Sequence, residues 1–277
     1  MTPDSWLAAH AYLRPVADFA AEVDRATTAL GILQAPVPDW ADYRADFLAG
    51  VTLLHSAAAA IDLEPGGRTA AALIEKLAIA RSSGWLAAET RFLHAELQRE
   101  PHAERRIVDL LLLGDESAVP SFPGLLRYLG WTAMARFLAP VVQAFHNWRD
   151  EEQWQRRYCP TCGSLPAMAQ LAGEEPGRRR LLSCGCCGTR WHFKRTSCPF
   201  CESDSQRLES VIIEGESGLR IDHCASCGGY IKTYDGHGDE SLFLLDWSSL
   251  HLDVLASDRG LKRLAASLYE FEPARHQ

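Results

Sequence analysis

The sequence predicts an α+β protein. It should have an all-helical N-terminal domain, two tandem metal-binding units of the rubredoxin-like or zinc-ribbon type with small antiparallel strands, and C-terminal helices. Three observations support this prediction. All nine cysteines lie between Cys159 and Cys227. The residues before them are rich in Ala and Leu at helical spacing. Beyond position 158, short apolar segments alternate with Gly, Ser and Asp.

The N-terminal part is predicted to be helical because apolar side chains recur there at intervals of three and four residues. Residues 40–61, 104–113 and 125–148 show the pattern, and Pro140 is expected to kink the last of these helices. Residues 248–256 and 259–269 return to helical spacing near the C-terminus, with Gly260 as a break. Short strands are predicted at residues 180–184, 208–214, 219–222 and 230–234.

Four Cys-x-x-Cys pairs divide the cysteine-rich part into two near-equal units. In order they are Cys159 and Cys162, Cys184 and Cys187, Cys198 and Cys201, and Cys224 and Cys227. Between the second cysteine of one pair and the first of the next there are 21 residues in the first unit and 22 in the second. We therefore predict a helical domain at 1–155, a first four-cysteine ribbon at 156–196, a second at 197–240 and C-terminal helices at 241–277.

The spacing predicts two metal sites. Two thiolates separated by two residues can hold one ion from a tight turn, and a second such turn brought in by a hairpin completes a tetrahedron. We expect two mononuclear tetrathiolate ions, either iron or zinc, with the eight paired cysteines as ligands. Four repeated pairs in a chain without a secretory signal disfavour a redox pair or a disulfide framework.

Two points about the cysteines stay open at this level. Pairing in sequence order is favoured by loop closure and by the repeat. However, only ten residues separate Cys187 from Cys198, so a site built from the second and third pairs is also possible. The ninth cysteine, Cys186, is expected to be a small buried or half-buried thiol.

Charge and hydropathy limit the classes of function. The chain has 28 basic and 36 acidic residues, a net charge of −8, so attraction to nucleic acid or to an anionic membrane is not expected by default. The longest uncharged apolar stretch, residues 47–61, is shorter than the roughly 20 residues that a spanning helix needs. The N-terminus has an acid where a secretory signal needs basic residues, so we expect a cytoplasmic protein.

A local excess of positive charge keeps nucleic-acid binding open as an alternative. Residues 159–201 contain six basic residues, which surround Trp191 and His192: Arg178, Arg179, Arg180, Arg190, Lys194 and Arg195. A second alternative is a rubredoxin-like electron-transfer protein, in which iron in a tetrathiolate site changes oxidation state. No phosphate-binding loop, nucleophile elbow or His-Glu-x-x-His motif occurs, so we do not expect an enzyme.

The segment 159–232 resembles the formate dehydrogenase accessory protein family (FdhE-like). The resemblance is carried by Cys-Pro-Thr-Cys-Gly-Ser-x-Pro from Cys159, by the three later cysteine pairs, and by Arg180, Trp191, Arg195, Tyr230 and Lys232. Glu202 departs from the family pattern, because a glycine usually follows this cysteine.

The resemblance implies a cytoplasmic, non-catalytic accessory factor. It would bind the catalytic subunit of a molybdenum- or tungsten-dependent respiratory formate dehydrogenase and support its maturation. It also favours iron in the cysteine sites, and it makes the five non-cysteine residues named above candidates for contact with that partner.

Overall fold

The structure is a computed structural model that describes residues 2–80, 86–114, 121–174, 176–216 and 218–271. These residues form two compact units, each assembled from separate parts of the chain. The sheet unit comprises residues 1–14, 45–52 and 149–267, and the helical unit comprises 15–44, 53–148 and 268–277. The predicted division into four segments is finer and stays a prediction, because compactness does not show which segments fold alone.

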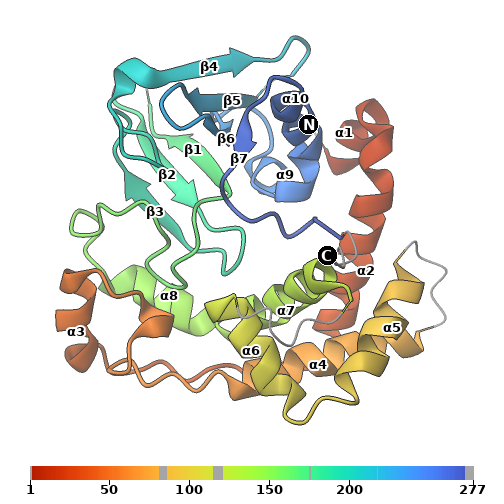
Figure 1. Cartoon of the computed structure of the whole chain (residues 1–277). Helices are drawn as coiled ribbons and strands as arrows, with labels where there is room; N and C mark the ends of the chain where they lie inside the picture. The colour runs from red at the N-terminus through yellow and green to blue at the C-terminus, as the bar shows by residue number, and fades with distance from the viewer. Residues whose placement is uncertain (1, 81–85, 115–120, 175, 217, 272–277) are drawn as a thin grey trace. The chain divides into compact units, whose positions relative to one another are not determined.

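The helical unit is organised around α4 (Glu64–Ile79), which packs against α5 (Ala87–Leu97), α6 (Ala103–Leu113) and α7 (Pro123–Phe137) (Figure 1). Leu73, Ile74 and Leu77 lie on the buried face of α4. Gly67 allows α6 to approach closely, since a Cβ at this position would lie 2.2 Å from the carbonyl oxygen of Glu104. The unit also contains α2 (Arg14–Thr28) and α8 (Ala139–Trp148).

Two of the predicted helices are shorter than expected. The helix predicted at 40–61 ends early, since α3 spans Trp40–Ala49 and is followed by Gly50 at a φ of +87°. Pro140 does not kink one long helix but lies in the first turn of a second, because α7 ends at Phe137 and α8 begins at Ala139. Proline fits a first turn, where its missing N–H has no partner to lose. No helix among the described ranges is long and apolar enough to cross a membrane.

In the described part of the chain, seven strands form one sheet, in which the two cysteine-rich units contribute the same pattern. The first unit supplies β1 (Met168–Ala172), β2 (Arg179–Ser183) and β3 (Arg190–Phe193) as an antiparallel meander. The second supplies β4 (Leu208–Ile212), β5 (Leu219–Cys224) and β6 (Gly229–Tyr234) in the same way. The predicted strands are confirmed, while β1 and β3 were not predicted.

The two meanders join through β1 and β6, which pair in parallel with Met168 opposite Lys232. The strand order is therefore β3-β2-β1-β6-β5-β4, with β7 (Lys262–Arg263) added to β6 (Figure 1). Every residue of β6 is buried, as expected for a strand with neighbours on both sides. The two predicted ribbons thus share one continuous sheet.

The C-terminal part of the sheet unit contains α9 (Glu240–Phe243) and α10 (Leu250–Asp258). The helix predicted at 259–269 is wrong. Gly260 at a φ of +71° ends α10, and the amide of Leu261 donates to the carbonyl of Ala256. The following residues form β7 instead, because their backbone completes the ladder beside the first residues of β6.

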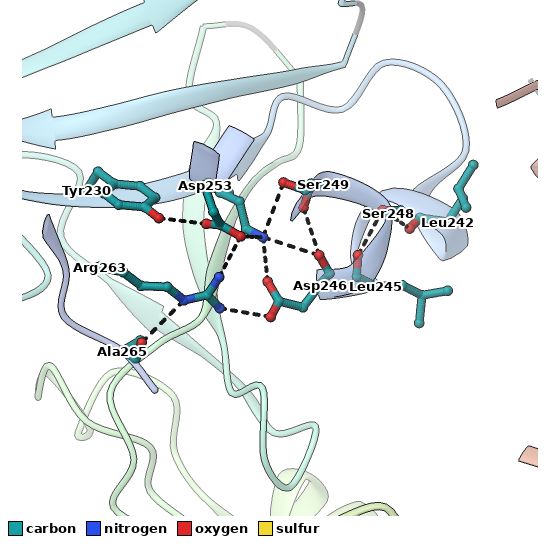
Figure 2. Close-up of polar contacts among 10 residues, drawn as sticks. Tyr230, Leu242, Leu245, Asp246, Ser248, Ser249, Asp253, Arg263 and Ala265 are labelled. Carbon is teal, nitrogen blue, oxygen red and sulfur yellow. Dashed lines mark hydrogen bonds and ion pairs between the residues drawn. The ribbon is translucent and has the colours of Figure 1, made fainter. Parts of the chain in front are cut away.

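A buried ion-pair cluster ties β6 to this C-terminal part. Lys232, whose side chain is only 1% exposed, places Nζ 2.5 Å from Asp246 Oδ1 and 2.9 Å from Asp253 Oδ2. Arg263 donates to Asp246 at 2.8 Å and to Asp253 at 2.7 Å. The Tyr230 hydroxyl donates to Asp253 at 2.7 Å, and these contacts are drawn in Figure 2. Two cations thus balance two anions in an interior where an unpaired charge is costly.

We expect Lys232→Met to lower the free energy of unfolding by about 3 to 5 kcal/mol, because it leaves two buried carboxylates with one cation. The measurement is denaturant unfolding of the metal-loaded protein. Lys262→Met is the matched control, since this lysine is exposed on β7 and should change stability by less than about 0.5 kcal/mol. Equal effects of the two substitutions would contradict the role given to the cluster.

The cluster also predicts a dependence of stability on acid. Burial alone would raise the pKa of Asp246, but the charges of Lys232 and Arg263 outweigh it and lower this pKa below its ordinary value. The carboxylate therefore stabilises the fold above about pH 4, and this contribution is lost as the pH falls through the lowered value. Asp246→Asn should be less stable at neutral pH, yet lose less stability between about pH 5 and 2 than the parent. Asp258→Asn, at the exposed end of α10, should follow the parent curve.

Candidate metal centres

The sheet places the four cysteine pairs at equivalent positions in its two halves. In each half one pair precedes the first strand of the meander and the other occupies the turn between the second and third strands. The backbone repeats as well, because the amides of Cys159, Cys184 and Cys198 donate to the carbonyls five residues further on, those of Ser164, Thr189 and Ser203. These turns bring the two pairs of each half together in sequence order, and the alternative pairing is not observed.

The first cluster consists of Cys159, Cys162, Cys184 and Cys187, and all four side chains are buried. Their sulfurs lie within 4.8 Å of one another, with 3.5 Å between Cys159 and Cys187 and 3.4 Å between Cys162 and Cys184. Nearby, the hydroxyls of Thr161 and Thr189 are hydrogen-bonded at 2.7 Å.

The second cluster consists of Cys198, Cys201, Cys224 and Cys227 and is more open. Its sulfurs also lie within 4.8 Å, with 3.8 Å between Cys198 and Cys227 and 3.8 Å between Cys201 and Cys224. Cys198 and Cys224 are buried, whereas Cys201 is exposed and Cys227 is half-buried. The two halves of the sheet therefore differ in how far solvent reaches the sulfurs.

Both clusters fit a tetrahedral metal ion. Zinc–sulfur bonds of about 2.3 Å in a tetrahedron place the sulfurs about 3.8 Å apart, which the second cluster matches and the first approaches. The thiols do not titrate alike: burial raises the pKa of Cys159, while hydrogen bonds from Cys159 and Cys184 lower that of Cys162. Four thiolates can share so small a space only around a cation. The clusters can thus hold two metal ions, and the donor set suits zinc or iron equally.

Hydroxyl groups two residues after the second cysteine were missed by the sequence reasoning. Ser203 Oγ lies 3.1 Å from Cys201 Sγ and 3.2 Å from Cys224 Sγ. Ser164 and Thr189 occupy the same position in the first half, 3.4 Å from Cys162 Sγ and 3.2 Å from Cys187 Sγ. Such hydroxyls can donate to thiolates and stabilise their charge. The signal that would have found them is a Ser or Thr two residues after three of the four pairs.

Glu202 occupies a backbone conformation that normally favours glycine. Its φ is +62°, close to the +80°, +75° and +70° of Gly163, Gly188 and Gly228, which follow the other three pairs. Its amide donates to the carbonyl of Cys198 at 3.0 Å, so the turn is the same one. The departure seen in the sequence is therefore accommodated with backbone strain and without a change of geometry.

Cys186 lies beside the first cluster without belonging to its four-sulfur group. It is half-buried, in line with the prediction, and the hydroxyl of Ser164 lies 3.5 Å from its sulfur.

Four of the five predicted partner residues are buried in the sheet unit. Trp191 donates from Nε1 to the carbonyl of Arg156 at 3.0 Å, and Tyr230 and Lys232 belong to the ion-pair cluster. Arg180 donates to the carbonyls of Lys194 and Ser197 between the two ribbons.

Burial lowers the pKa of Arg180 to about 10. Arg195 is exposed, and it is the one of the five that a partner can reach directly. Contact with a partner stays a prediction for all five.

Basic residues of the first ribbon line a surface hollow of about 370 Å³. The hollow also includes Glu152, which lies 3.8 Å from Arg179 Nη1. Arg178 donates to the carbonyl of Asp235 at 2.5 Å, and Arg195 donates to the carbonyl of Arg178 at 3.0 Å. These contacts already engage some of the basic side chains on which the prediction of nucleic-acid binding was based. Nucleic-acid binding stays a prediction.

Comparison with known proteins agrees with this geometry. A family model described as FdhE, central domain, matches residues 158–195, which contain the first cluster. A protein FdhE homolog of Edwardsiella ictaluri is 30% identical over 172 residues, and protein FdhE of Escherichia coli O9:H4 is 27% identical over 144 residues. The crystal structure of the FdhE protein from Pseudomonas aeruginosa matches with a TM-score of 0.61 over 90% of this chain and 87% of that one.

The chain is similar to FdhE proteins in sequence and in fold. The matches to the first two relatives cover 60% and 51% of this chain, and it spans about half of their length, 54% and 47%. Identity to the solved structure is 22%, so that comparison establishes the fold. The resemblance noted from the sequence, and the α+β fold with two four-cysteine groups, are thereby confirmed.

We expect Glu202→Gly to stabilise the protein by up to about 1 kcal/mol, because glycine adopts a positive φ without the steric cost that a Cβ brings. Glu209→Gly is the control: the same substitution in the extended strand β4 should destabilise by about 0.5 to 1 kcal/mol. Denaturant midpoints of the metal-loaded variants measure both changes. A loss of stability in Glu202→Gly would show that the carboxylate contributes more than the backbone strain costs.

Proposed function

We propose that this chain is an accessory factor that binds the catalytic subunit of a respiratory formate dehydrogenase and supports its assembly or activity. The observation that carries the proposal is the FdhE central-domain match over the first cluster, together with the two FdhE relatives. The arrangement of the thiols supports a non-catalytic role. Four cysteines per metal leave no open coordination position for a substrate, as is typical of structural sites.

In this proposal the metal ions stabilise the surface that the partner meets. Each half of the sheet has strands of only four to six residues, too short to hold the cysteine turns in place alone. A tetrathiolate ion fixes two turns at once, and with them the strands between. The exposed Arg195 and Arg179, at the hollow of the first ribbon, provide positive charge for an acidic surface on the partner.

The test is co-expression of the tagged full chain with the formate dehydrogenase catalytic subunit, followed by affinity capture and metal analysis. The parent should retain the subunit, and Cys187→Ser should lose both the first-cluster metal and the captured subunit. Cys186→Ser is the matched control: it changes a neighbouring thiol outside the four-sulfur group and should preserve both.

A surface variant separates binding from folding. Arg195→Glu should reduce capture by about tenfold, equivalent to about 1.4 kcal/mol, at unchanged metal content. Failure of the parent to capture the subunit, or undiminished capture by Cys187→Ser, would count against the proposal.

A further inference from the structure

Three side chains outside the cysteine clusters converge within the sheet unit. They are His10 at the end of α1 (Pro3–Ala9), Glu216 between β4 and β5, and His251 in α10. Their ligand atoms lie within 4.8 Å of one another. Glu216 Oε1 is 2.8 Å from His10 Nε2 and 3.0 Å from His251 Nε2, so the Nε2 atoms of both imidazoles lie close to one carboxylate oxygen.

The hydrogen bonding of His10 indicates that a positive charge is needed between its imidazole and the carboxylate of Glu216. His10 Nδ1 lies 3.1 Å from the carbonyl oxygen of Trp6, which can only accept, so Nδ1 carries the proton. In a neutral imidazole the other nitrogen, Nε2, then carries a lone pair and can only accept a hydrogen bond, yet it faces a carboxylate oxygen. Two acceptors at that distance repel unless a positive ion lies between them. A proton on Nε2 or a bound metal ion can supply that charge.

The group is buried and held in place before any ion arrives. The side chains of His10, Glu216 and His251 are only 12%, 9% and 9% exposed. His10 stacks on Trp6 with 3.8 Å between ring centroids, and Trp6 is fixed by a 3.0 Å hydrogen bond from Nε1 to the carbonyl of Ser248. An imidazole bonded through Nδ1 to a backbone carbonyl is oriented as metal-binding histidines usually are.

Buried polar atoms that lack hydrogen-bond partners also indicate that this group binds an ion. Within the part of the chain that the structure describes, Glu216 Oε2 and His251 Nδ1 are buried without a hydrogen-bond partner. Buried polar atoms without partners are uncommon in native proteins and call for an explanation.

We propose that His10, Glu216 and His251 form a third metal site, which binds one divalent ion of the zinc class through two imidazole nitrogens and one carboxylate. This donor set is used for zinc, with a fourth position left for water or another ligand. Metal–ligand bonds of about 2.0 to 2.2 Å in a tetrahedron place the ligand atoms about 3.3 to 3.6 Å apart, so the 2.8 and 3.0 Å separations here would widen by about 0.3 to 0.8 Å on binding. Tyr12, near both imidazoles and 62% exposed, leaves the site within reach of solvent.

The site would join three parts of the chain that are far apart in sequence. Its ligands connect the N-terminal helix α1, the loop after the edge strand β4 and the C-terminal helix α10. Within the sheet unit, a metal ion here would fasten α1 to α10 and to the loop after β4 independently of the eight cysteines. The inference therefore does not depend on the function proposed above.

The test is zinc stoichiometry of the full chain after exposure to zinc(II) and dialysis. The parent should retain about three zinc ions, two in the cysteine clusters and one here, and Glu216→Gln and His251→Gln should retain about two. His237→Gln is the matched control, because this histidine is 69% exposed in the same unit and pairs only with Asp235 among the described residues; it should retain the parental number.

Cobalt(II) provides a readout that needs no variant. Cobalt in the cysteine clusters gives thiolate-to-metal charge-transfer bands, whereas a third equivalent should add ligand-field bands without them. Two zinc ions in the parent, or the same number in the parent and both variants, would overturn the proposal.

Discussion

The convergence of four sulfurs in each half of the sheet is the constraint on which the rest of this structure depends. Strands of four to six residues provide little apolar surface, and two cysteine turns cannot be held together by their own hydrogen bonds. Each set of four thiols becomes stable only with a cation at its centre. The turns, the hydroxyls beside the sulfurs and the strained backbone at Glu202 all serve this arrangement.

A second constraint arises where the two halves meet. The parallel pairing of β1 with β6 puts β6 inside the sheet and places Lys232 where water cannot reach it. An ammonium group in that position needs anionic partners, and Asp246 and Asp253 come from the chain after the second ribbon. The C-terminal segment thus supplies the charge balance that allows a lysine in the middle of a buried strand.

The local part of this architecture could be read from the sequence, and the long-range part could not. Cysteine spacing predicted the two clusters and favoured their pairing in sequence order, and helical periodicity predicted α6 and α7 in outline. Met168–Ala172 reads as readily as a helix, and it is a strand because β2 and β6 lie on either side of it. The helix expected at 259–269 does not form, because part of this segment pairs with β6 as strand β7 instead. His10, Glu216 and His251 share no local pattern at all, so only the fold could bring them together.

The seam between β1 and β6 also has a consequence for the order in which the protein folds. Each cysteine cluster closes loops of about twenty residues, whereas the seam joins Met168 to Lys232 across most of both ribbons. Contacts between residues far apart in sequence carry a larger loop-closure cost and form later. Metal capture in the two ribbons can therefore come first and shorten the effective separation across the seam. A chain with one empty ribbon would reach the closed sheet more slowly, leaving the edges of β1 and β6 open to other strands in the meantime.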